Sequence, residues 1–285
     1  MKFANYSVFS TDLHRFGIDF ALEHTEKLGF NAIEWIDVSL DENRRIKSTD
    51  EAKELSRKIS DKGFDTACYS LLVNLQAPEQ DKTIDGVYRH IEYAAIMGFP
   101  FVHHTVVPGY NYSEATKPIS EMISLVADGA EKIAKRCNEY GITCLYEPQG
   151  LYFNGVAGLA PLLTEMKKRA TNVGVCGDVG NCLYVDDDPV TVFEAFAPEI
   201  LHVHMKDYTV RAEKGDNPTT KPSRGGRWLT ISEIGAGDID LVGAMRALKN
   251  VDYDGAFALE VAGDDDFMRR SIEYLKSVHC QVYGN

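Results

Sequence analysis

Several features that would narrow the function quickly are missing from this chain of 285 residues. Its six cysteines form no C-x-x-C pair, and Cys144 and Cys176 lie inside apolar runs, where a free cysteine behaves as a small buried hydrophobe. We therefore expect a reducing compartment. No apolar stretch approaches the ~20 residues of a membrane helix, and residues 1–6 contain no hydrophobic segment of signal-peptide length. These absences predict a cytoplasmic protein with no membrane partner.

Basic residues are also scarce. The chain has 30 lysines and arginines against 43 aspartates and glutamates, which gives a formal net charge of -13. No basic face could offset that charge cheaply, so a nucleic-acid partner is not expected. The glycine fingerprint G-x-G-x-x-G does not follow the first expected strand, which argues against a dinucleotide-binding fold.

What the chain does contain is a regular alternation of short apolar runs and amphipathic segments. Such alternation predicts an α/β fold with a parallel sheet, and eight units in a chain of this length favour a single (β/α)8 TIM barrel, one domain over residues 1–285. We expect strands at residues 3–10, 31–38, 64–75, 101–107, 142–147, 173–178, 200–204 and 256–261. We expect helices at residues 20–30, 48–63, 78–97, 113–140, 159–170, 189–196, 239–248 and 265–278, and a long polar loop at 208–232.

The last four of these strands each end in a residue that can bind a metal: Glu147, Asp178, His204 and Glu260. Taken singly, each is more often a salt-bridged, capping or core residue. The strand ends of a barrel surround one mouth, and neighbouring strands are about 4.8 Å apart. We therefore expect the four side chains to share one site.

Three carboxylates and one imidazole suit a divalent cation. We expect one metal ion, with manganese first and cobalt, magnesium or zinc as alternatives. A buried polar cluster without a metal is the competing interpretation, but it would hold more negative charge than one imidazole can balance.

The same stretches resemble the xylose isomerase-like barrel superfamily, and within it the group of ketose 3-epimerases, inosose dehydratases and hydroxypyruvate isomerases. The matching pieces are Leu145–Pro148, Gly177–Asn181, His202–Asp207, Ile234–Asp240 and Leu259–Glu260. The resemblance implies that the four residues bind manganese, cobalt, magnesium or zinc and that the two glutamates move a proton. It also implies a possible homodimer or homotetramer.

The chemistry expected of such a site is proton transfer next to a carbonyl group. A divalent cation held by a substrate carbonyl and a neighbouring hydroxyl makes the adjacent C–H more acidic and stabilises a cis-enediolate. One glutamate removes that proton and the other returns one from the opposite face. We assign Glu147 and Glu260 as this catalytic pair and leave open which is the base. The sequence thus predicts a divalent-metal-dependent isomerase or epimerase acting on a small-molecule ketose or related polyol ketone.

Four further residues are expected to bind substrate. Tyr6 lies in the first expected strand. Alternation turns one of His103 and His104 inward, and we take His104. The family often has a histidine three residues after the metal aspartate, where this chain has Asn181, which donates a hydrogen bond but does not titrate near neutral pH. Arg211 lies near the place of a substrate-binding arginine of the family.

Two other functions compete with this prediction. A metal-dependent lyase could expel a β-hydroxyl from the same enediolate, as inosose or dehydroshikimate dehydratases do, or release a C-linked aglycone from a 3-keto-glycoside. Asn181 in place of histidine keeps this alternative open. Endonuclease IV, a related barrel with three metals, would need many more histidine and carboxylate ligands and a less acidic surface, so it is not favoured.

Overall fold

Eight parallel strands form a closed barrel, as the alternation of strands and helices predicts. They are β1 (Lys2–Asn5), β2 (Ala32–Asp37), β3 (Asp65–Leu71), β4 (Phe101–His104), β5 (Thr143–Tyr146), β6 (Val173–Asp178), β7 (Ile200–Met205) and β11 (Ala256–Leu259). Their order in the barrel is β1-β11-β7-β6-β5-β4-β3-β2. The computed structural model describes residues 1–76 and 78–284, and residues 77 and 285 lie outside that description.

Two compact units make up the chain. Residues 1–31 and 177–285 form one, called here the terminal unit, and residues 32–176 form the other, called the central unit. The single domain expected over residues 1–285 stays a prediction. None of the described helices, in residues 1–76 and 78–284, combines the length and the apolar character that crossing a membrane requires.

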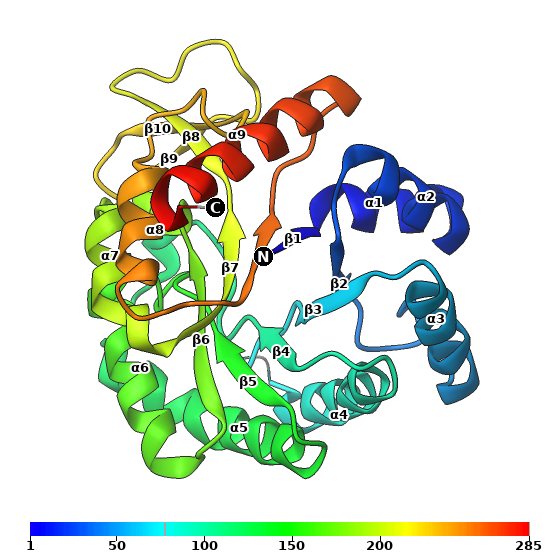
Figure 1. The fold of residues 1–285 in the computed structure, drawn as a ribbon. Helices are drawn as coiled ribbons and strands as arrows, with labels where there is room; N and C mark the ends of the chain where they lie inside the picture. Colours follow the sequence, from blue (N-terminus) through cyan, green and yellow to red (C-terminus); the bar gives the residue numbers. More distant parts are fainter. Residues whose placement is uncertain (77, 285) are drawn as a thin grey trace. The chain divides into compact units, whose positions relative to one another are not determined.

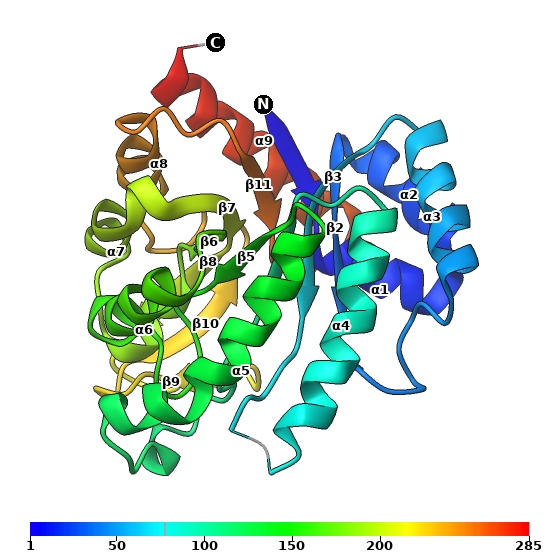
Figure 2. The same cartoon turned by 90° about the horizontal axis from the view of Figure 1, so that it is seen from below.

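Helices of the central unit pack outside its strands (Figure 1). They are α3 (Thr49–Asp61), α4 (Gln80–Ile96), the short η1 (Tyr112–Glu114), α5 (Ile119–Glu139) and α6 (Gly155–Arg169). Ser48 begins α3 because its side chain accepts the N–H of Glu51. Figure 2 shows α4 and α5 side by side. In the core, Trp35 of β2 pairs with Tyr69 of β3, and their rings stack 6.3 Å apart.

The terminal unit contains both ends of the described chain. Its helices are α1 (Ser7–Phe16), α2 (Ile18–Leu28), the short η2 (Asn181–Val185) and η3 (Ala197–Glu199), α7 (Pro189–Phe196), α8 (Leu241–Lys249) and α9 (Asp265–Tyr283). Aspartate side chains begin three of them by accepting a backbone N–H of the first turn: Asp188 for α7, Asp240 for α8 and Asp264 for α9. Strand β1 pairs in parallel with β11.

The first expected strand, at residues 3–10, is wrong beyond Asn5. The Asn5 side chain accepts the N–H of Phe9 at 3.0 Å, and the Ser10 N–H donates to the Tyr6 carbonyl at 2.9 Å, so a helix begins where the strand was expected to continue. The apolar pair Val8 and Phe9 is buried as one face of α1. A short apolar run does not by itself distinguish a strand from a buried helical turn.

The loop expected at residues 208–232 is also wrong, because it contains a small antiparallel sheet. Strands β8 (Asp207–Arg211), β9 (Lys221–Pro222) and β10 (Trp228–Ser232) lie in the order β8-β10-β9 (Figure 1). Leu229 pairs with Val210, and Ile231 pairs with Tyr208. The glycines and charged residues between these short strands concealed them. Other expected boundaries also shift: β3 ends at Leu71, β4 ends at His104, and Pro118 delays the start of α5 until Ile119.

Candidate functional site

Three of the four expected metal ligands lie in the terminal unit, and their side chains converge. The Nδ1 atom of His204 lies 3.2 Å from Oε2 of Glu260 and 3.8 Å from Oδ2 of Asp178. His204 and Asp178 are fully buried, whereas the Glu260 side chain is 28% exposed. The three residues therefore form one cluster, called here the terminal cluster, with its open side at Glu260.

Strand register places Glu260 two positions beyond the residue that pairs with His204. In the parallel pair β7–β11, Ala258 lies opposite His204, and the N–H of Glu260 donates to the Met205 carbonyl at 2.9 Å. Glu260 thus continues the ladder just past the end of β11. The sequence places a carboxylate there after four apolar residues, and the ladder fixes its backbone.

A tight turn after β6 sets the direction of Asp178. Its Oδ1 atom accepts the N–H groups of Gly180 and Asn181 at 2.8 and 2.7 Å, which leaves Oδ2 directed toward the cluster. A Cβ atom at Gly180 would lie 2.7 Å from Lys206 and from the ring of Tyr208. The glycine is therefore required by close packing, and this explains the Gly-Asp-Val-Gly-Asn sequence in physical terms.

Lys206 is a member of the cluster that the sequence analysis missed. Its ammonium lies 2.8 Å from Oδ2 of Asp178, 2.8 Å from Oε2 of Glu260 and 3.2 Å from the side-chain oxygen of Asn181. The side chain is only 4% exposed. A lysine within the buried run His202–Asp207 needs anionic partners, and that was the available signal. Two carboxylates that already draw a buried ammonium form an environment that favours cations.

The four expected substrate-binding residues have different surroundings. The ring of Tyr6 stacks on the ring of His204, and Asn181 contacts Lys206. Both therefore border the terminal cluster. The exposed Arg211 donates instead to Asp238, at 2.8 Å, which ties it to the end of the small sheet.

Asp207, directly after Lys206, organises the neighbouring loop. Its carboxylate accepts four backbone N–H groups, those of Tyr208, Gly235, Gly237 and Ile239. A Cβ atom at Gly237 would come within 2.1 Å of that carboxylate. Burial raises the pKa of Asp207, and the N–H groups oppose this effect. The Ile-Gly-Ala-Gly-Asp motif thus wraps one buried carboxylate.

The fourth expected ligand, Glu147, lies in the central unit directly after β5 and is buried. The Gln149 amide donates to its Oε2 atom, and the Nε2 atom of His103 lies 3.3 Å from the same oxygen. His104, the expected substrate contact, has its Nδ1–H on the Thr105 carbonyl and its ring edge-on to Tyr146. Adjacent strand residues face opposite sides, so His103 and not His104 contacts Glu147.

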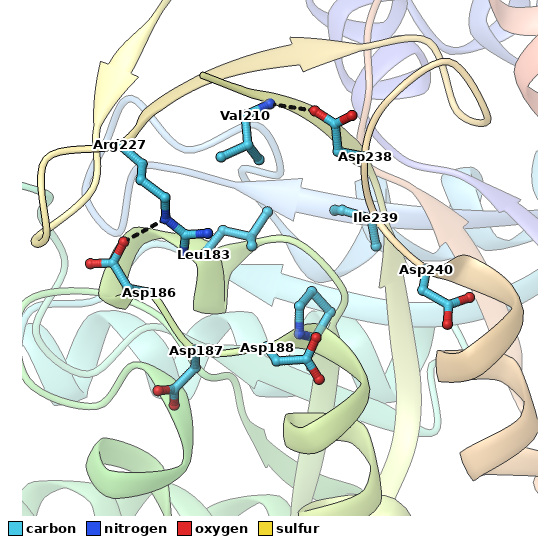
Figure 3. Close-up of a pocket in the computed structure, with 10 residues that line it drawn as sticks. Leu183, Asp186, Asp187, Asp188, Val210, Arg227, Asp238, Ile239 and Asp240 are labelled. Carbon is cyan, nitrogen blue, oxygen red and sulfur yellow. Dashed lines mark hydrogen bonds and ion pairs between the residues drawn. The ribbon is translucent and has the colours of Figure 1, made fainter. Parts of the chain in front are cut away.

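A separate hollow of about 300 Å³ lies in the terminal unit and contains five aspartates (Figure 3). Asp186 accepts hydrogen bonds from Ser223, Gly225 and Arg227, and Asp238 accepts the Val210 N–H. Asp188 and Asp240 cap helices α7 and α8. These four carboxylates serve structural contacts, so the hollow is not the candidate site.

The donor set of the terminal cluster fits a divalent cation. Aspartate and glutamate supply hard carboxylate oxygens, and a neutral imidazole supplies nitrogen, a combination that suits manganese, cobalt, zinc or magnesium. Asp178, His204 and Glu260 are the residues that could hold such an ion here.

Comparison with known proteins gives a family and a set of similar folds. A family model described as xylose isomerase-like TIM barrel matches residues 22–278. The structure of L-ribulose 3-epimerase has a TM-score of 0.75 at 14% identity and covers 99% of this chain and 95% of that chain. No match was found among curated protein sequences.

Two other solved structures are similar over nearly their full lengths. The probable 3-DHS dehydratase AsbF from Bacillus anthracis has a TM-score of 0.73 at 17% identity and covers 97% of this chain and 99% of that chain. The IOLI protein, solved with a binding zinc atom, has a TM-score of 0.71 at 16% identity and covers 99% of this chain and 98% of that chain. At these identities the likeness shows the fold alone.

Proposed function

Because the chain belongs to the xylose isomerase-like TIM barrel family, we propose that it is a divalent-metal-dependent sugar isomerase or epimerase acting on a ketose or a related polyol ketone. The observation that carries this proposal is the terminal cluster, in which Asp178, His204 and Glu260 meet around a buried ammonium. A fold shared with many activities does not identify a function, so the argument rests on these residues.

We propose that Glu147 completes the ligand set. Strands β5, β6, β7 and β11 are successive neighbours in the barrel order. Glu147 and Glu260 directly follow their strands, Asp178 ends its strand, and His204 is the last residue but one of its strand. Parallel neighbours present their carboxyl ends at the same edge. Manganese is the preferred ion of the proposal. The zinc atom in the IOLI structure supports a divalent metal in a similar fold without identifying the ion for this chain.

The chemistry proposed for the site is proton transfer between carbon atoms. A bound divalent cation would polarise a substrate carbonyl and so acidify the neighbouring C–H. Glu147 and Glu260 are the proposed acid and base: one removes a proton from the carbon next to the carbonyl, and the other delivers a proton to the opposite face. Glu260, at the exposed side of the cluster, is reachable by a substrate. The buried Asp178 and His204 have no part in moving the proton.

The proposed substrate contacts are residues that border the terminal cluster. Tyr6 and Asn181 border the cluster and are proposed to line the sugar site, whereas the contacts of His104 and Arg211 give no support to that role. The expected homodimer or homotetramer stays a prediction.

A lyase is the second candidate, and two observations favour keeping it. Asn181 stands where the family often has a histidine, and the fold is similar to that of a probable dehydratase. A lyase and an epimerase begin with the same proton removal. They differ in product, because loss of water or of an aglycone changes the product mass and epimerisation does not.

The test combines metal content with proton exchange. Purified protein is analysed for manganese, cobalt, magnesium and zinc by mass spectrometry, and then incubated in D2O with a panel of ketoses and keto-polyols. We expect about one metal ion per chain and deuterium at the carbon next to the carbonyl. Glu147→Gln and Glu260→Gln should abolish the exchange, and the exposed Glu213→Gln serves as the matched control. Full exchange in both site variants would contradict the proposal.

A further inference from the structure

A buried chain of hydrogen bonds runs across the central unit and ends at Glu147. We infer that Gln149, His103, Ser70 and Glu34 are positioning residues that hold the Glu147 carboxylate in one orientation. The inference rests on the proposed function for the role of Glu147, but the chain itself is a property of the structure.

The chain crosses neighbouring strands in sequence. Oγ of Ser70, on β3, lies 2.5 Å from Oε1 of Glu34, on β2, and 3.1 Å from Nδ1 of His103, on β4. On the other side of the His103 ring, Nε2 lies 3.2 Å from the amide nitrogen of Gln149, which also donates to Glu147. Ser70 and His103 are direct register partners in the β3–β4 pair, so the backbone sets their approach.

Counting hydrogens gives the chain a single direction. The Ser70 hydroxyl has one hydrogen and donates it to Glu34. Its oxygen therefore accepts from His103, which places the ring hydrogen on Nδ1. Nε2 is then the acceptor, and the Gln149 amide supplies one hydrogen to it and the other to Glu147. In this arrangement the hydroxyl, imidazole and amide hydrogens named above all have acceptors.

Burial makes this arrangement specific. Glu34, Ser70 and His103 are 0%, 1% and 3% exposed, so water cannot replace a lost partner. Breaking one of these hydrogen bonds leaves a buried polar group without its partner, which is unfavourable. A flipped His103 ring would present C–H groups to Ser70 and Gln149 and lose both hydrogen bonds, and a rotated Gln149 amide would set its oxygen against two acceptors. Glu34 and Ser70 thus act on Glu147 through His103 and Gln149.

The orientation of the Glu147 carboxylate affects both of its proposed roles, as a metal ligand and as a proton acceptor or donor. Groups that hydrogen-bond to metal-binding side chains commonly change metal affinity by about 10–100-fold when they are lost. Proton transfer is equally sensitive to the position of the accepting oxygen. If these hydrogen bonds only stabilised the fold, breaking one would change unfolding but would leave metal affinity unchanged.

The experiment measures the manganese affinity and the tautomer of His103, and it needs no substrate. Protein labelled with 15N-histidine is studied by NMR at alkaline pH, where the imidazole is neutral, and His103→Asn assigns the signal. Manganese alone is titrated to obtain its dissociation constant. We expect His103 to carry its hydrogen on Nδ1, and Ser70→Ala to lose that preference and to weaken manganese binding about tenfold. Ser70→Thr, which keeps the hydroxyl, should restore both.

A control variant and the possible outcomes distinguish the positioning role from the metal site of the proposed function. Ser271→Ala removes a buried serine of the terminal unit and should leave manganese affinity and the His103 signal unchanged. A His103 ring with its hydrogen on Nε2, or a Ser70→Ala protein with unaltered tautomer and affinity, would overturn the positioning role. Wild-type protein that binds no manganese but shows the Nδ1 tautomer would instead contradict the metal site of the proposed function.

Discussion

The ring of Tyr6 stacks on the ring of His204, with centroids 5.0 Å apart and planes inclined by 12°. Tyr6 directly follows β1, and His204 lies in β7, so the contact joins the first residues of the chain to the proposed metal site. The phenol ring covers one face of the imidazole and restricts its rotation. A residue expected to touch substrate thus also supports a proposed metal ligand.

Removing that ring should loosen His204. We predict that Tyr6→Ala weakens manganese binding about tenfold, the effect typical of a group that orients a ligand. Tyr6→Phe keeps the ring and should bind manganese as the wild type does. Isothermal titration of the three proteins measures this. Equal affinity in Tyr6→Ala would show that the stacking does not orient His204.

Lys206 neutralises the carboxylates of the terminal cluster when no metal is bound. Lys206→Met should therefore destabilise the metal-free protein by about 3 kcal/mol, because removing one partner leaves buried carboxylate charge without its cation. Saturating manganese should recover more of the melting temperature in this variant than in the wild type. Thermal unfolding with and without manganese checks both effects, with the exposed Lys53→Met as control. A similar manganese shift in all three proteins would contradict the prediction.

His90 makes stability depend on acid pH. Burial lowers its pKa from 6.5 to about 4, and the folded ring accepts from Tyr69 and donates to the Ser39 carbonyl. The folded state therefore binds fewer protons than the unfolded state between these two pH values. The contribution of His90 to the free energy of unfolding is fully present above pH 6.5 and is lost as the pH falls to about 4. The whole loss amounts to about 3 kcal/mol.

The matched variant isolates this effect from that of other titrating groups. His90→Gln cannot gain a proton, so its free energy of unfolding should fall less steeply between pH 6.5 and about 4. Urea unfolding at a series of pH values gives the difference between the two curves. Parallel curves would mean that His90 does not contribute to acid sensitivity.

Asp207 should control the order of the loop at residues 234–240. Asp207→Ala removes the acceptor of four N–H groups, so we expect a loss of about 2–4 kcal/mol and faster hydrogen exchange in that loop. Asp207→Asn keeps one acceptor oxygen, so its stability and its rate of hydrogen exchange should lie between those of the wild type and those of Asp207→Ala. Hydrogen exchange read by mass spectrometry reports on the loop directly, with exposed Asp216→Ala as control. Unchanged exchange in Asp207→Ala would contradict this role.

The barrel could be predicted because its signal is repeated. Each strand is an apolar run of similar length, and each is followed by an amphipathic segment, so one misread element does not alter the pattern. Val8 and Phe9 show the limit of this signal, because two apolar residues fit a strand and a helix equally well. The small sheet was missed for another reason: Lys221–Pro222 is too short to show a period.

Some residues of the candidate site could likewise be predicted from the sequence, and others could not. Asp178, His204 and Glu260 could be expected to meet because strand ends in a barrel share one edge. Lys206 and His103 could not be placed so simply, since their roles depend on which side each faces and on partners far away in sequence. His103 and His104 differ by one position, and only the register of β4 with β3 and β5 decides which approaches Glu147.

The terminal unit joins two segments that lie far apart along the chain, residues 1–31 and 177–285. Strand β1 pairs with β11, so Asn5 lies opposite Leu259. Residues 32–176 are continuous and can form their own contacts during synthesis, whereas β1 must wait for its partner. Glu260 follows β11 directly, so the proposed ligands can meet only after residue 260 has been synthesised.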